Sequence, residues 1–263
     1  VLPNMITSAA LACGLAGLHF AMNFRYEQAL IAIALSAVFD ALDGRAARLL
    51  HVTSRFGAVL DSLSDFASFG IAPAVVLYQW MLRDPDTGGR PALPHTFEPL
   101  FMLCVLTYAM CAAMRLARFT SAKPAKKSNP LASRFFVGMP TPAAALAVLI
   151  PVLLDVSPTV KWQVPPLVVA GYILAIGLLM VSRRPMFSFK KVRVQRGLVL
   201  PLFLAVGVLV LIAFKDPWLA TAILAASYLA TLPVSHVAHA KARAQMLDSE
   251  AARTAATVKG GNG

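Results

Sequence analysis

Residues 40–65 read DALDGRAARLLHVTSRFGAVLDSLSD and hold four of the chain's 12 acidic residues: Asp40, Asp43, Asp61 and Asp65. The flanking runs are apolar, and a charge at membrane depth costs ~2.5–3.5 kcal/mol, so such residues normally face a cavity or a partner. The spacings i, i+3 and i, i+4 put each pair on one helix face. Because the link at 50–56 is short, the two helices are antiparallel neighbours, and we expect the four carboxylates to meet at one depth.

The whole chain has the composition of a multi-pass membrane protein. Its 263 residues are 58% hydrophobic with a mean hydropathy of +0.70, and 14% are charged, against about 25% in soluble domains. These values exclude a soluble enzyme, a disulfide scaffold and a disordered chain. The three cysteines lie in apolar runs without C-x-x-C spacing, which argues against a metal site or disulfide framework there. The net charge of +12 indicates basic loops facing anionic lipid, with no nucleic-acid partner.

The predicted fold is an all-α integral membrane protein with eight spans. A span needs about 20 apolar residues, and the runs are 4–22, 27–49, 57–82, 97–120, 138–156, 163–182, 197–214 and 217–235. With both ends in the cytoplasm, nearly all of the 24 Lys and Arg residues fall on the cytoplasmic side. The exceptions are Arg25, Arg83, Arg90, Lys161 and Lys215. The predicted location is therefore the cell membrane, with the aspartates just inside the cytoplasmic face.

The aspartates predict a divalent-metal site. Four carboxylates so close together need a cation, and hard oxygen ligands suit Mg²⁺ or Mn²⁺, with two ions sharing carboxylates as in many enzymes that act on diphosphates. The alternative is a charge-paired hairpin neutralised by Arg45, Arg48 and Arg55. Gly44 and Ala47 leave room for a ligand against the backbone, or they serve helix packing.

The spacing Asp40-x2-Asp43-Gly44-x2-Ala47-Arg48-x8-Gly57-x3-Asp61-x3-Asp65 resembles the signature of the CDP-alcohol phosphotransferase family. Residues 61–74, 115–119 and 138–145 resemble its phosphatidylserine synthase branch. The likeness runs from Pro3 to about residue 182 and implies a six-helix core. We expect that core over 1–196, two additional C-terminal transmembrane helices over 197–235, and a polar cytoplasmic tail over 236–263.

The resemblance implies transfer of a phosphatidyl group from CDP-diacylglycerol to the hydroxyl of L-serine, with release of CMP, by a homodimer in the lipid bilayer. Asp40, Asp43, Asp61 and Asp65 would hold two Mg²⁺ or Mn²⁺ ions, and Asp65 would also be the catalytic base. The residues implied for CDP-diacylglycerol binding are Asn4, Thr7, Gly44, Ala47, Arg48 and Ser54. For Asn4 and Thr7, capping of the first helix is an equal alternative.

Serine carries a carboxylate, so its site must present a cation. Arg118 is the first candidate and Arg115 the second, with Ser68 as a hydroxyl contact. Both arginines have the alternative role of anchoring a basic loop at the membrane surface. A cation transporter would have broken helices and carboxylates near the midplane of the bilayer, whereas these carboxylates are expected near one face. Within the family, the alternative acceptors are glycerol 3-phosphate, inositol phosphate and choline.

Overall fold

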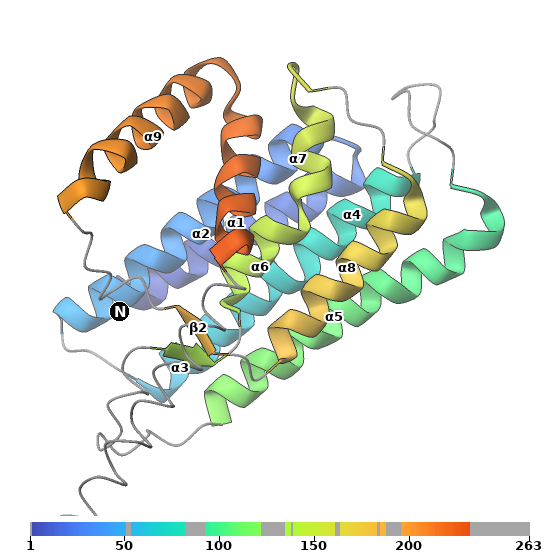
Figure 1. Ribbon diagram of the computed structural model, residues 1–263. Helices are drawn as coiled ribbons and strands as arrows, with labels where there is room; N and C mark the ends of the chain where they lie inside the picture. Colours follow the sequence, from blue (N-terminus) through green and yellow to red (C-terminus); the bar gives the residue numbers. More distant parts are fainter. Residues whose placement is uncertain are drawn as a thin grey trace, which may run out of the picture.

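The computed structural model describes residues 2–50, 54–82, 93–121, 135–137, 139–160, 164–182, 185–187 and 196–231, almost all of them helical (Figure 1). The elements are α1 (Leu2–Met22), α2 (Tyr26–Leu49), α3 (Arg55–Asp65), the π-helix η1 (Phe66–Ile71), α4 (Ala72–Leu82), the 3₁₀ turn η3 (His95–Phe97), α5 (Glu98–Ser121), α6 (Thr141–Val148), α7 (Ile150–Val156), α8 (Pro166–Val181) and α9 (Arg196–Lys215). A further helix covers Pro217–Thr231. Two short strands, β1 (Phe135–Val137) and β2 (Pro185–Phe187), complete the set.

Each of the eight predicted spans contains helix, and the chain is an integral membrane helical protein. Among the helices that the structure describes, three are long and apolar enough to cross a bilayer: Pro3–Met22, Arg55–Leu82 and Glu98–Ser121. Three shorter apolar helices cover Pro166–Val181, Leu200–Lys215 and Pro217–Thr231. The total of eight spans therefore stays a prediction, and the predicted tail over 236–263 lies outside the described residues.

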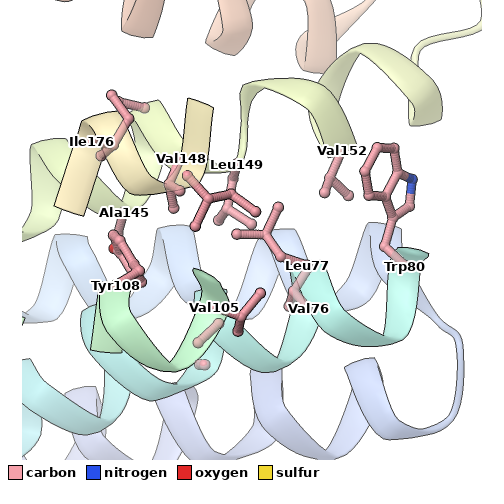
Figure 2. Close-up of a cluster of buried hydrophobic side chains, with 14 of the residues drawn as sticks. Val76, Leu77, Trp80, Val105, Tyr108, Ala145, Val148, Leu149, Val152 and Ile176 are labelled. Carbon is pink, nitrogen blue, oxygen red and sulfur yellow. The ribbon is translucent and has the colours of Figure 1, made fainter. Parts of the chain in front are cut away.

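The buried core is formed where α4, α5, α6, α7 and α8 meet (Figure 2). Leu77 of α4 and Tyr108 of α5 are fully buried in it, as is Val148 of α6. Trp80 lies at one edge, where its indole N–H donates to the Asp155 carboxylate over 2.8 Å. α8 comes close to α5 because Gly177 has no side chain; a Cβ there would lie 3.3 Å from the Tyr108 Cα.

Two prolines interrupt helices inside the bundle, and in each case a tyrosine hydroxyl replaces the lost hydrogen bond. Pro73 has no N–H to offer the Phe69 carbonyl four residues earlier, and the Tyr108 hydroxyl donates to that carbonyl over 2.8 Å. Pro151 likewise has no N–H to offer the Ala147 carbonyl four residues earlier, and the Tyr172 hydroxyl donates to that carbonyl. In an apolar bundle an unpaired carbonyl is costly, so these tyrosines tie α5 and α8 to the broken helices.

β1 and β2 pair antiparallel, with Phe136 opposite Met186. The sequence analysis predicted no strand here. The pairing joins the segment before α6 to the segment after α8, at the end of the bundle that also carries the N-terminus and α3 (Figure 1). Three-residue strands lack the alternating pattern by which strands are identified in a sequence.

Asp216 fixes the turn between α9 and the helix Pro217–Thr231. It is 1% exposed, and its carboxylate accepts hydrogen bonds from the Ser157 and Thr159 hydroxyls and from the Leu219 amide. Burial raises the pKa of Asp216, but these hydrogen bonds outweigh it and hold the pKa below its ordinary value. The turn is thereby fastened to the end of α7.

We predict that Tyr108→Phe lowers the free energy of unfolding by about 1 kcal/mol, because the Phe69 carbonyl loses its donor inside the bundle. The measurement is thermal unfolding of the detergent-solubilised protein. Thr107→Val is the matched control on α5, since among the described residues the Thr107 hydroxyl donates only to the Leu103 carbonyl of its own helix. Equal midpoints for the two variants would contradict the assignment.

We also predict that Asp216→Asn destabilises the protein at neutral pH by about 1–3 kcal/mol, because a neutral amide replaces the charged acceptor of the Ser157 and Thr159 hydroxyls. The pKa is lower in the folded state, so this stabilisation is complete above the ordinary aspartate pKa of about 3.9 and is lost as the pH falls through the folded-state value. Unfolding midpoints recorded from pH 7 down to pH 3 should fall less steeply for the variant. Parallel pH profiles would refute the role of the carboxylate.

Candidate active site

Three carboxylates meet between α2 and α3. Asp40 comes from α2, and Asp61 and Asp65 come from one face of α3; each offers an oxygen within 4.8 Å of the other two. All three side chains are half-buried. Carboxylates at this spacing repel one another unless protons or a cation intervene. Oxygen ligands in such a group fit a hard divalent cation.

Asp43 lies beside this group rather than in it. Its side chain is 5% exposed, and Oδ2 is buried without a hydrogen-bond partner among the residues that the structure describes. A buried carboxylate oxygen without a donor is costly, so this oxygen also fits a cation. The expected meeting of four carboxylates is thus found for three of them, with Asp43 one helical turn along α2.

A cavity of about 290 Å³ adjoins the carboxylates. Asp61 belongs to both, because it lines the cavity and is one of the three clustered carboxylates. The lining residues come from the starts of α1 and α3 and the end of α2: Pro3, Asn4, Thr7, Asp43, Gly44, Ala47, Ser54, Gly57, Ala58 and Asp61. Five of the six residues predicted for nucleotide binding are in this set. The exception is Arg48, whose Nε donates to the Gly44 carbonyl over 2.7 Å.

Gly57 explains how α1 and α3 come together at this cavity. A Cβ at Gly57 would lie 2.9 Å from the Asn4 Oδ1 and 3.1 Å from the Ser54 Oγ. Ser54 caps α3, since its hydroxyl accepts from the Gly57 amide over 3.0 Å. The motif therefore needs glycine at position 57 for the close approach of the two helices, a role that its place in the motif alone did not predict.

The π-helix η1 begins directly after Asp65. Because a π-helix has a wider turn than an α-helix, η1 rotates the buried face of α4 relative to the face of α3 that carries Asp61 and Asp65. Gly14 of α1 accommodates this segment, because a Cβ there would fall 2.1 Å from the Ser68 Oγ. Such turns are common at functional sites, and the only signal for this one in the sequence is Pro73, one turn later.

The predicted acceptor residues lie in three different environments. Arg115 is half-buried, interacts electrostatically with Asp65, and donates from Nη1 to the buried Thr141 hydroxyl. Arg118 is exposed, and its Nη1 donates to the Val181 carbonyl over 3.0 Å, at the end of α8. Ser68 is fully buried against α1, and its hydroxyl has no partner among the described residues.

Comparison with known proteins identifies the family. The sequence profile of the CDP-alcohol phosphatidyltransferases matches residues 1–182. Three similar proteins, each named CDP-diacylglycerol–serine O-phosphatidyltransferase, come from Mycobacterium leprae (strain TN), Helicobacter pylori (strain J99) and Bacillus subtilis (strain 168). The Mycobacterium protein is 32% identical, over 89% of this chain and 73% of its own length. The Helicobacter protein is 31% identical, over 86% of this chain and 87% of its own length. The Bacillus protein is 29% identical, over 72% of this chain and 92% of its own length. The profile covers every residue of the carboxylate cluster and its cavity, and the chain belongs to the CDP-alcohol phosphatidyltransferase family.

Proposed function

We propose that this protein is a phosphatidylserine synthase, which transfers the phosphatidyl group of CDP-diacylglycerol to the hydroxyl of L-serine and releases CMP. The observation that supports this proposal is the shared position of Asp61, which lines a cavity of about 290 Å³ and belongs to the group of three carboxylates. The nucleotide would bind in that cavity. The names of the relatives at about 30% identity support serine as the acceptor.

Asp40, Asp43, Asp61 and Asp65 would hold two divalent ions, Mg²⁺ or Mn²⁺. When bound, such ions neutralise the oxygens of the diphosphate and stabilise the charge that develops during displacement at phosphorus. The support is the spacing of Asp40, Asp61 and Asp65 and the unpartnered buried oxygen of Asp43.

The chain's own residues would bind and orient the two substrates. Gly44 and Ala47 give the cytidine access to the backbone of α2, while Asn4, Thr7 and Ser54 offer polar groups from the opposite wall of the cavity. Arg48 lies one turn beyond Gly44, and its Nε donates to the Gly44 carbonyl. To contact the diphosphate, the guanidinium would break this hydrogen bond and donate to phosphate oxygens instead.

In the transfer step, the serine hydroxyl oxygen attacks the phosphorus that carries diacylglycerol. A bond forms between that oxygen and phosphorus, the bond from phosphorus to the bridging oxygen breaks, and CMP leaves with the bond electrons. Asp65 takes the hydroxyl proton, a role that requires the hydroxyl within about 3 Å of its carboxylate. The acyl chains stay in lipid while the headgroup reacts at the end of the bundle.

For the serine carboxylate, the geometry favours Arg115 over Arg118. Arg115 lies beside Asp65, where the acceptor hydroxyl must be, whereas the Arg118 guanidinium bonds to the end of α8. A role for Ser68 in the acceptor site stays a prediction, as does the homodimer. We further propose that this end of the bundle faces the cytoplasm, because Arg45, Arg48, Arg55, Arg115 and Arg118 gather there.

We predict that activity requires added Mg²⁺ or Mn²⁺. Asp40→Asn, Asp43→Asn and Asp61→Asn should each reduce turnover by at least about a hundredfold, because loss of a carboxylate ligand weakens binding of the ion that the diphosphate needs. The assay is CMP release by purified protein with CDP-diacylglycerol and serine, with and without EDTA. Glu27→Gln is the matched control, because Glu27 is exposed at the far end of α2. Full activity in EDTA, or in any of the three aspartate variants, would refute the metal site.

We predict that L-serine supports CMP release far better than ethanolamine, glycerol 3-phosphate, inositol phosphate or choline. Arg115→Ala should raise the KM for serine roughly ten- to a hundredfold, because a hydrogen bond to a charged group contributes ~1.5–3 kcal/mol. The KM for CDP-diacylglycerol should change much less. Arg118→Ala is the matched control; if it raises the serine KM and Arg115→Ala does not, the two arginines have the opposite roles.

A further inference from the structure

The helix Pro217–Thr231 packs into the bundle although it lies beyond residues 1–182, the stretch that the family profile matches. Ala222 is buried in the main hydrophobic cluster, and Trp218, Tyr228 and Leu229 pack against that cluster. α9, which precedes it, is different: its side chains from Leu200 to Lys215 are almost all exposed, and Figure 1 shows it apart from the other helices. The second added helix is therefore part of the folded core.

Contacts at its two ends define the course of this helix. At its start, the Asp216 carboxylate accepts a hydrogen bond from the Ser157 hydroxyl at the end of α7. Tyr228 lies 12 residues later, about 18 Å along a helix at 1.5 Å per residue. Tyr228 packs against the main hydrophobic cluster and interacts electrostatically with Arg115, whose Nη1 donates to Thr141. This end of the helix therefore lies in the region of Arg115 and Thr141.

Arg115 occupies that same region. Its Nη1 donates to Thr141, and it interacts electrostatically with both Asp65 and Tyr228. The Arg115 Nε is buried and has no hydrogen-bond partner within the described ranges. A guanidinium has five N–H donors in a fixed plane, so its direction depends on which acceptors surround it. Thr141 supplies one from α6, and the phenol oxygen of Tyr228 is suited to supply a second.

We infer that Tyr228 is a positioning residue whose phenol oxygen holds the Arg115 guanidinium toward Asp65, so that the helix Pro217–Thr231 completes the acceptor pocket from beyond the stretch that the family profile matches. The inference rests on the proposed function, because Arg115 is placed there as the group that binds the acceptor's carboxylate. Without the phenol oxygen, Arg115 keeps its charge and its bond to Thr141 but loses the contact that fixes its direction.

The test is steady-state kinetics of Tyr228→Phe, which removes one oxygen. We expect the KM for serine to rise about tenfold, kcat to change less than about threefold, and the KM for CDP-diacylglycerol to stay the same. Ser227→Ala is the control on the same helix, since the exposed Ser227 bonds only to the Leu224 carbonyl. Tyr172→Phe is the control for loss of a buried structural hydroxyl, and it should lower the unfolding midpoint without changing the serine KM.

A double-mutant cycle with Arg115→Ala separates positioning from a general effect on folding. If Tyr228 acts through Arg115, adding Tyr228→Phe to Arg115→Ala should raise the serine KM by less than twofold further. A multiplicative effect in the double variant, or an unchanged serine KM in Tyr228→Phe alone, overturns the inference.

CMP release by the wild-type protein with each acceptor of the panel tests the proposed function separately from the role of Tyr228. If the wild type prefers another acceptor, the proposed function fails, and the same variants are then scored on the KM for that acceptor. A rise of about tenfold for Tyr228→Phe there still supports its positioning role, and no rise overturns it.

Discussion

Mutual repulsion among carboxylates held inside an apolar bundle is the constraint on which the rest of this structure depends. Asp40, Asp61 and Asp65 lie within 4.8 Å of one another on helices that pack in the membrane protein's interior. Such a group is unfavourable unless a cation compensates it. The surrounding helices hold the three carboxylates at this spacing, which fits a hard cation between them.

The bundle holds that site rigid by satisfying backbone groups that its own prolines leave unpaired. Tyr108 and Tyr172 donate to the Phe69 and Ala147 carbonyls, and each bond crosses from one helix to another. Both interruptions lie in segments that also carry site residues: Pro73 follows Asp65 by two turns, and α6 begins at Thr141, the partner of Arg115. Helix breaks and functional side chains therefore occur together, since the irregular backbone is stabilised by neighbouring helices.

The cavity beside the carboxylates depends on small residues at close helix approaches. Gly57 lets α3 come against Asn4, and Gly14 lets η1 come against α1. The two contacts fix how the start of α1 covers the carboxylate face, so the cavity walls are set by the same packing that stabilises the bundle. The added C-terminal helix joins this packing through Ala222 and approaches Arg115 through Tyr228.

The sequence by itself determined the membrane class, the helical segments and the aspartate motif, because hydropathy and i, i+3 or i, i+4 spacing are local properties that any helix expresses. It also identified the family, through fixed positions within one hairpin. Only the tertiary structure decided that Asp43 lies beside the cluster, that Arg115 rather than Arg118 lies by Asp65, and that Tyr228 approaches the same place. Those outcomes depend on the π-turn after Asp65, the break at Pro151 and the rotation of α5 against its neighbours. No local sequence pattern determines how two packed helices are rotated relative to each other.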